Sequence, residues 1–197
     1  MEDMVIEESF WKGRRVLITG HTGFKGGWLS LWLTKLGAKV YGYAIDPPNS
    51  PSFFKEAKVE SFIEKSIYGN ILDIELFTKK MLDISPEIVI HMAAQSLVKD
   101  SYSNPKLTLS TNIMGTVNLF EAIRKTPSVK AVLNITSDKC YENNETDIGY
   151  TEKDPMGGFD PYSSSKGCSE LISSAYRNSF FHNSGIALAT ARAGNVI

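Results

Sequence analysis

The chain alternates short apolar runs with longer helical patterns, and this alternation constrains the fold more than any other feature. The apolar runs are rich in β-branched residues and predict strands at residues 15–19, 39–44, 64–68, 87–92, 129–135 and 186–191. Between and after them, helices are predicted at residues 24–36, 74–82, 105–125 and 160–181. Strands that alternate with helices in this way form a parallel sheet with helices on both faces. The sequence therefore predicts an α/β fold with a doubly wound parallel sheet.

Composition and charge bound the function classes. The 197 residues are 42% hydrophobic and 22% charged, which is ordinary for a globular chain with one substantial core. Because 21 Lys and Arg nearly cancel 22 Asp and Glu, no global field would collect nucleic acid or hold the chain on an anionic membrane. The first residues are acidic, and no apolar run approaches the roughly 18 residues of a membrane span. We therefore expect a cytoplasmic protein that binds neither nucleic acid nor membranes.

The cysteines and histidines do not predict a metal site. Cys140 and Cys168 are far apart and form no CxxC pattern, and the chain has only three histidines. No metal ion and no disulfide framework are expected.

A glycine-rich segment, G-H-T-G-F-K-G, lies between the first predicted strand and the first predicted helix. Gly20, Gly23 and Gly26 would permit a tight turn and a close approach of the backbone to a pyrophosphate, and Phe24 begins the helix. The helix N-terminal amides would then hold the phosphate charge. Glycine-rich turns also arise from simple packing of a helix on a strand, but this one lies in the first βα unit. We interpret it as the dinucleotide loop of a Rossmann-type sheet, with these four residues at the cofactor.

Two acidic residues are candidates for the rest of the dinucleotide. Asp46 follows the second predicted strand, somewhat past the offset of about 20 residues at which an acid usually binds the ribose hydroxyls of NAD. The alternative is a turn-initiating Asp before Pro47-Pro48. No arginine nearby would accept a 2′-phosphate, so NAD is favoured over NADP. Asp73 is expected to cap the next helix, and together with Ile74 it is also assigned to the adenine end of the cofactor.

Tyr162 and Lys166 form a YxxxK pattern. Residues at i and i+4 of a helix share one face. An ammonium group beside the phenol would lower the tyrosine pKa from about 10 and make Tyr162 a general base. The pattern is common by chance, but here it follows a dinucleotide loop and the fifth predicted strand.

With these motifs in order from residue 20 to residue 195, the chain resembles the extended short-chain dehydrogenase/reductase family. The resemblance implies that Tyr162 and Lys166 also hold the nicotinamide ribose. It further implies that the segment H-M-A-A-Q passes the cofactor where the fourth strand ends, with Ala93 and Ala94 in contact with it. Asn112 is similar to the asparagine of the family's central helix, and we assign it an organising role.

The end of the fifth predicted strand points to a branch of this family. Thr136 is followed by Ser137, Asp138 and Lys139, and ligands of open α/β sheets bind beyond the carboxyl ends of strands. A hydroxyl residue followed by two ionisable residues is similar to the sugar-nucleotide 4,6-dehydratases, and the lysine resembles their CDP-glucose branch. Ser96 departs from that branch, where proline is expected. The alternative interpretation is a solvated Asp-Lys pair in a loop.

The resemblance implies a lyase reaction on a nucleotide sugar, with CDP-glucose favoured, for deoxysugar and lipopolysaccharide biosynthesis. Tyr162, hydrogen-bonded through Ser137, would take the proton of the sugar 4-hydroxyl during oxidation at C4. Lys139, with a lowered pKa, would remove the C5 proton, and protonated Asp138 would donate to the departing C6 hydroxyl. The division of acid and base between these two stays open. Other interpretations are an epimerase or dehydratase of another nucleotide sugar, or an NAD-binding module without turnover.

Family members continue after the sixth strand into a lobe that closes over the nucleotide sugar. The resemblance therefore implies that residues 1–197 form the NAD-binding domain with its catalytic residues and that the substrate-binding lobe is absent from this chain. Asn195 resembles a residue at the start of that substrate region. A homodimer through the helices that begin near Pro105 and Asp160 is also implied.

Overall fold

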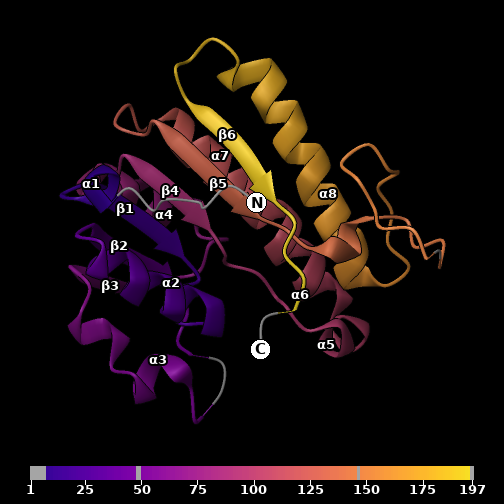
Figure 1. The fold of residues 1–197 in the computed structure, drawn as a ribbon, viewed down its shortest axis with the longest axis horizontal. Coiled ribbons are helices and arrows are strands. Elements are labelled where there is room, and N and C mark those ends of the chain that lie inside the picture. The colour runs from indigo at the N-terminus through magenta and orange to yellow at the C-terminus, as the bar shows by residue number, and fades with distance from the viewer. Residues whose placement is uncertain (1–7, 48–49, 146, 196–197) are drawn as a thin grey trace.

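A six-stranded parallel sheet forms the centre of the molecule. The computed structural model describes residues 8–47, 50–145 and 147–195. The strands are β1 (Arg15–Thr19), β2 (Lys39–Ala44), β3 (Lys65–Tyr68), β4 (Ile88–His91), β5 (Ala131–Ile135) and β6 (Ala187–Ala191), and their order is β3-β2-β1-β4-β5-β6 (Figure 1). Every pairing is parallel. The predicted Rossmann-type topology is confirmed, and the strand order reverses between β1 and β4, where such sheets bind ligands.

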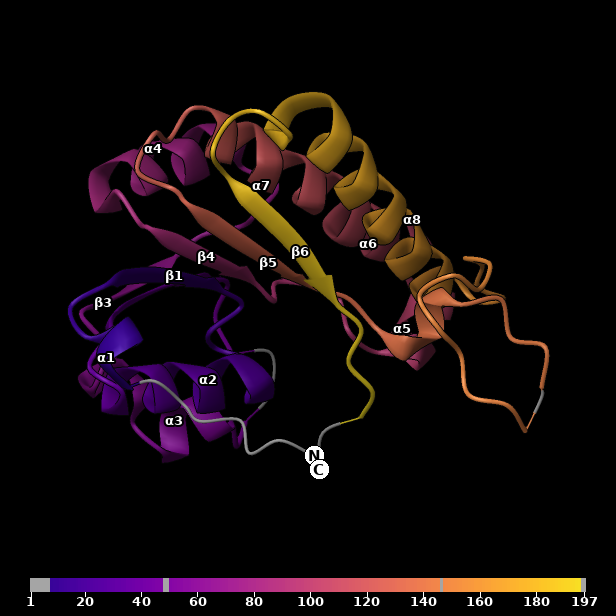
Figure 2. The same cartoon turned by 45° about the horizontal axis from the view of Figure 1, so that its top comes forward.

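Helices cover the sheet on two sides. The predicted helices are present as α2 (Phe24–Lys35), α4 (Ile74–Ile84), α6 (Pro105–Leu109), α7 (Gly115–Arg124) and α8 (Pro161–Tyr176). Figure 2 shows α4, α7 and α8 on one side of the sheet and α2 and α3 on the other. Short elements that were not predicted are α1 (Glu8–Trp11), α3 (Phe53–Glu56), η1 (Val59–Ser61), α5 (Val98–Ser103) and η3 (Asp138–Cys140). They are too short to show a periodic apolar pattern.

Two of the predicted helices are not α-helical throughout. A π-helical turn, η2 (Ser110–Met114), joins α6 to α7, and another, η4 (Arg177–Phe181), extends α8. The prediction of uninterrupted α-helices over residues 105–125 and 160–181 is therefore wrong in these two turns. Each π turn holds one more residue than an α turn, and such turns occur often at functional sites.

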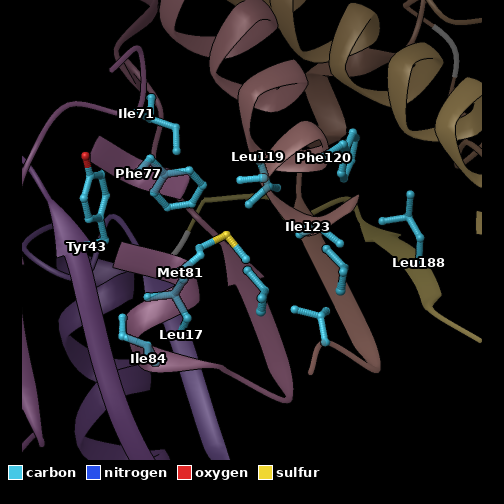
Figure 3. Packing of buried hydrophobic residues seen from close by; sticks show 14 of the residues in the cluster. Leu17, Tyr43, Ile71, Phe77, Met81, Ile84, Leu119, Phe120, Ile123 and Leu188 are labelled. Atoms are coloured by element: carbon cyan, nitrogen blue, oxygen red, sulfur yellow. The ribbon is translucent and has the colours of Figure 1, made fainter. Parts of the chain in front are cut away.

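Two apolar clusters lie on opposite faces of the sheet, because successive strand residues point to opposite faces. Leu17 of β1 faces the larger cluster, which α4 and α7 complete with Phe77, Met81, Leu119, Phe120 and Ile123 (Figure 3). Val16 and Ile18 face the other cluster with Leu33 and Phe54. On this second face the β5–β6 end is more open, since Leu133 and Ile135 are only half-buried.

The predicted helix boundaries follow local chemistry. The Asp73 carboxylate accepts from Leu76 N at 3.0 Å and caps α4, and Asp160 accepts from Ser163 N at 3.0 Å ahead of Pro161. Gly37, at φ +87°, follows α2 in the left-handed conformation that was predicted for it. Among the described residues, no helix is long and apolar enough to cross a membrane. The same residues include no cluster of three or more His, Cys, Asp or Glu side chains that could hold a metal ion.

Candidate active site

The glycine loop connects β1 to α2 and lies against the end of β4. Gly20 has φ +77°, and a Cβ there would lie 2.7 Å from Ala93 N. A Cβ on Gly26 would overlap Gly20 O. Any side chain at these two positions would force the loop apart. The loop therefore fits a dinucleotide. Its backbone lies close to the end of β4, and glycine at positions 20 and 26 keeps these close backbone contacts free of side chains.

Thr19, the last residue of β1, holds the end of β4 in place. Its hydroxyl oxygen accepts from Met92 N at 3.1 Å and from Ala93 N at 3.2 Å, and it lies 2.7 Å from Nδ1 of His91. Burial, aided by the Lys166 ammonium, lowers the pKa of His91 to about 3. His91 is therefore neutral. Because the Thr19 oxygen already accepts from two backbone N–H groups, its hydroxyl is placed to donate to Nδ1 in the tautomer that leaves this nitrogen unprotonated. Sequence reasoning missed Thr19, since nothing in its neighbours distinguishes it from any other strand residue.

The two predicted cofactor acids follow β2 and β3. Asp46 is exposed, and the Thr22 hydroxyl donates to Ile45 O at 3.0 Å, which holds the residue before Asp46 against the glycine loop. Asp73 serves as the helix cap, as predicted, and Ile74 is half-buried in the first turn of α4. Their contacts with a cofactor stay predictions. Both acids follow strands whose carboxyl ends share an edge with the loop, as an elongated ligand requires.

Lys166 is buried in α8 beside the end of β5. Its Nζ donates to Ile135 O at 3.2 Å. Burial lowers the pKa of Lys166 to about 8, the Lys25 ammonium lowers it as well, and the Glu170 carboxylate opposes them. Lys25 belongs to the first turn of α2, and sequence reasoning gave it no role although it lies within the quoted glycine segment. The structure thus places two lysines of distant elements near each other.

Tyr162 does not have the lowered pKa that its spacing from Lys166 predicted. Burial raises the pKa of Tyr162, a hydrogen bond with the Ser137 side chain lowers it, and the carboxylates of Asp138 and Asp160 raise it. The expected lowering of this pKa by the Lys166 ammonium is therefore not found, because burial outweighs the hydrogen bond that favours the phenolate. The predicted contact between Tyr162 and Ser137 is present.

Ser137, Asp138 and Lys139 form a single turn where β5 ends. The buried Ser137 hydroxyl donates to Asp138 Oδ1 at 3.0 Å and accepts from Lys139 N at 3.2 Å. Lys139 Nζ lies 3.8 Å from Asp138 Oδ1, and the two side chains are 40% and 55% exposed. The pair is partly solvated, as the loop interpretation held, but Ser137 connects it directly to Tyr162.

The segment after β6 crosses this group of residues. Ala193 O accepts from Asp138 N at 3.3 Å, and Gly194 O accepts from Lys25 Nζ at 3.2 Å. Asn195 follows as an exposed residue. The predicted substrate residue Asn195 therefore directly follows two residues whose carbonyl groups contact the Ser137 turn and the glycine loop.

Asn112 lies in the π turn η2 and makes three hydrogen bonds. Its Oδ1 accepts from Gln95 N at 2.8 Å, and its Nδ2 donates to Gln95 O at 3.0 Å and to Ser165 Oγ at 2.8 Å. Asn112 thereby connects the segment after β4 to α8, between Tyr162 and Lys166. These contacts agree with the organising role.

The motifs, the sheet order and this arrangement match a known family. A family model described as GDP-mannose 4,6 dehydratase matches residues 17–191. The chain belongs to this family. It thereby falls within the extended short-chain dehydrogenase/reductase group of sugar-nucleotide dehydratase and epimerase families, as the sequence resemblance indicated.

Two curated relatives illustrate the range of similarity. CDP-glucose 4,6-dehydratase of Salmonella typhimurium is 54% identical over 198 residues, which cover 98% of this chain and 55% of that protein. dTDP-D-glucose 4,6-dehydratase of Dictyostelium discoideum is 30% identical over 188 residues, which cover 85% of this chain and 41% of that protein. The chain spans about half the length of the curated relatives it matches.

Solved structures share the fold. Epimerase Mth375 of Methanothermobacter thermautotrophicus superposes with a TM-score of 0.78 at 25% identity, covering 94% of this chain and 52% of that one. dTDP-glucose 4,6-dehydratase of Bacillus anthracis, solved in complex with NAD, superposes with a TM-score of 0.74 at 23% identity, covering 91% and 54%.

Proposed function

We propose that this chain is the NAD-binding and catalytic part of an enzyme that dehydrates CDP-glucose to CDP-4-keto-6-deoxyglucose, for deoxysugar and lipopolysaccharide biosynthesis in the cytoplasm. The observation that carries the proposal is the Ser137–Asp138–Lys139 turn, which adds an acid and an amine beside Tyr162 at the ligand-binding edge of the sheet. The 54% identity with the Salmonella CDP-glucose enzyme supports the choice of nucleotide. The substrate-binding lobe is proposed to lie outside these residues.

NAD is the proposed cofactor. The backbone of Gly20, Gly23, Phe24 and Gly26 would hold the diphosphate, and Ala93 and Ala94 would lie along the cofactor where β4 ends. Asp46 would bind the adenosine ribose hydroxyls, with Asp73 and Ile74 at the adenine. Lys166 and Tyr162 would hold the nicotinamide ribose. When bound, NAD would supply the acceptor for the C4 hydride and the donor that returns a hydride to C6.

The chain's own residues would move the protons. With substrate and cofactor bound, the buried Lys166 ammonium would stabilise the Tyr162 phenolate. The phenolate takes the proton of the sugar 4-hydroxyl and becomes the phenol, while Ser137 hydrogen-bonds to the reacting oxygens. Oxidation at C4 acidifies the C5 proton. Exclusion of water by the substrate disfavours the charged Asp138–Lys139 pair, so that a proton passes from the ammonium to the carboxylate. Lys139 then removes the C5 proton, and Asp138 donates to the departing C6 hydroxyl.

The test is incubation with NAD and CDP-glucose, beside its dTDP, UDP and GDP counterparts, followed by mass spectrometry. We expect loss of one water and a 4-keto product with CDP-glucose in preference to the others. Because this chain spans 55% of the Salmonella relative, the assay is run on the 197-residue chain and on one extended to the relative's length. Lys139→Ala should stop elimination, whereas Lys153→Ala, at an exposed lysine of the loop that follows η3, should not. Elimination at the native rate in Lys139→Ala would refute the role of Lys139.

The remaining outcomes separate the alternatives. A product of unchanged mass with inverted C4 identifies an epimerase, which needs Tyr162 and Lys166 but no elimination pair. NAD binding without any ketosugar, in the extended chain as well, identifies a binding module. Gly26→Ala, whose Cβ would overlap Gly20 O, should abolish NAD binding in every case.

A homodimer through α6 and α8 is proposed as the assembly. These helices lie side by side in both views (Figures 1 and 2), and each exposes a large apolar side chain, Leu107 on α6 and Leu171 on α8. Exposed apolar groups gathered on neighbouring helices favour association.

A further inference from the structure

A buried ion pair lies beside the candidate active site and takes no part in the proton transfers above. Arg192, just after β6, places one guanidinium nitrogen 3.1 Å from Glu170 Oε2 on α8, and the two side chains are only 16% and 6% exposed. Buried charges persist where hydrogen bonds satisfy them. Here the Thr136 hydroxyl donates to Glu170 Oε1, and the Thr190 hydroxyl donates to Oε2 at 3.0 Å.

The pair joins segments that are far apart in the sequence. Thr136 directly precedes Ser137, so the carboxylate of Glu170 holds the residue on which the Ser137 turn begins. Thr190 belongs to β6, and Arg192 leads into the segment that contacts Asp138 and Lys25. The ion pair therefore connects α8 to the ends of β5 and β6, and both of these ends carry predicted site residues.

Arg192 also holds the base of the loop between η3 and α8. Its guanidinium donates to Tyr141 Oη at 2.7 Å and lies 4.9 Å from the centre of the Tyr141 ring. Tyr141 in turn stacks on Tyr150, with ring centres 4.9 Å apart. Figure 2 shows this loop, in orange, projecting beyond the N-terminal end of α8. The two ends of the loop are joined by a hydrogen bond that Glu142 N donates to Pro155 O at 2.9 Å.

Glu170 has a second relation to the site through its helix. It follows Lys166 by four residues on α8, so the two buried side chains lie on one face. The charged groups that act on Lys166 are Glu170 on the same helix and Lys25 on α2, and the titratable His91 on β4 feels the Lys166 charge in turn. Since His91 is neutral and Lys25 is cationic, Glu170 is the anion that favours the Lys166 ammonium.

We propose that Glu170 and Arg192 are positioning residues of the site: Glu170 holds the Lys166 ammonium and the end of β5, and Arg192 holds the base of the loop over residues 141–157. The role rests on the proposed function, because it is defined for the Tyr162–Lys166 chemistry. The experiments that test it need no turnover, so its failure is distinct from failure of the dehydration assay.

The first experiment measures the titration of Lys166 in the 197-residue chain by NMR of lysines labelled with carbon-13, with Lys166→Arg to assign the signal. In the native chain the midpoint is expected at about 8. Glu170→Gln keeps the shape of the side chain and removes its charge, so the midpoint should fall by about one unit. Glu121→Gln, at the ion pair that Glu121 forms with Arg124 on α7, is the matched control and should leave it unchanged. A purely structural Glu170 would also leave it unchanged, and that result overturns the first half of the proposal.

The second experiment measures hydrogen exchange. Arg192→Met should accelerate exchange at residues 141–157 by about tenfold while the sheet keeps its protection, and Arg192→Lys should restore part of that protection. Arg124→Met, the control, should change nothing in this loop. Acceleration throughout the sheet, or none in the loop, overturns the role of Arg192. If Arg192→Met does not fold, Arg192→Lys carries the test, because one ammonium cannot donate to Glu170 and stack on Tyr141 as the guanidinium does.

Discussion

At the level of single residues, burial decides the protonation states around the site. His91 and Lys166 both have lowered pKa values, and Tyr162 has a raised one, with burial as the largest cause in each case. Each shift favours the neutral form of the group, as expected where charge loses its hydration. The Tyr162 hydroxyl is therefore a proton donor to its neighbours until substrate and cofactor change its surroundings.

His91 makes the stability of the fold depend on pH. Its pKa falls from 6.5 in the unfolded chain to about 3 in the folded one, so below pH 6.5 the unfolded state binds the additional proton. The contribution of His91 to stability is complete above this pH and should fall on acidification by up to about 1.4 kcal/mol per pH unit. Urea unfolding between pH 7.5 and pH 5 measures the slope. Burial also lowers the pKa of His21 to about 4, so His91→Gln should reduce the slope to the part that His21 contributes. His182→Gln, at an exposed histidine, should leave the native slope unchanged, and equal slopes in both variants would contradict the prediction.

At the level of secondary structure, the π turn η2 is an element whose side chains organise the site. The side chain of its central residue, Asn112, hydrogen-bonds to both the backbone N–H and the backbone carbonyl of Gln95, and it also donates to the Ser165 hydroxyl. Two residues on the α8 side, Tyr162 and Lys166, flank Ser165 in sequence. The turn therefore sets the distance between α8 and the end of β4.

Asn112→Ala should destabilise the chain by about 1–3 kcal/mol, because it leaves buried donors and acceptors without partners. Urea unfolding at constant pH measures the loss. Asn118→Ala removes an amide from the same helical stretch, where Nδ2 donates to Ile71 O at 3.1 Å but no partner needs Oδ1 among the bonds described. It should cost less. Equal losses would show that Asn112 has no special organising role.

At the level of the whole molecule, the strand order brings the site together. Strands β1 to β3 extend from the centre of the sheet to one edge. Strand β4 pairs with β1 on its other side, and β5 and β6 extend the sheet to the opposite edge. The glycine loop after β1 and the Ser137 turn after β5 therefore lie along one edge, although more than 100 residues separate Gly20 from Ser137. The open second face of β5 and β6 lies on the same half of the sheet as the Ser137 turn.

A substitution that places a charge in the proposed interface tests the dimer. Leu171 of α8 is 61% exposed, and Leu82 of α4 is 47% exposed on a helix outside the proposed interface. Leu171→Glu should convert a dimer to a monomer in light scattering after gel filtration, because the interface would have to bury the new carboxylate. Leu82→Glu should remain dimeric. A native chain that is already monomeric at micromolar concentration would contradict the proposal.

The bounds of the strands and the ends of the helices could be predicted from the sequence, because they depend on interactions between residues that are near each other in the chain. The strands agree with prediction to within two residues, the caps Asp73 and Asp160 are in place, and Gly37 ends its helix as expected. The role of Lys25 could not be predicted, since its hydrogen bond goes to a carbonyl 169 residues away. The π turn η2 was not predicted, because its residues are compatible with an α-helix and the contacts of Asn112 with Gln95 and Ser165 form only on folding.

The sequence alone determines the order of elements, the glycine loop, the helix caps and the shared face of Tyr162 and Lys166, since backbone conformation and i,i+4 spacing depend on near neighbours. Only the tertiary structure decides that Tyr162 is a protonated phenol and that the buried Lys166 interacts with the charges of both Lys25 and Glu170. It also decides that Arg192 is buried against Glu170. Burial and Coulomb interactions depend on groups that only folding brings together, so no pattern of neighbouring residues contains them.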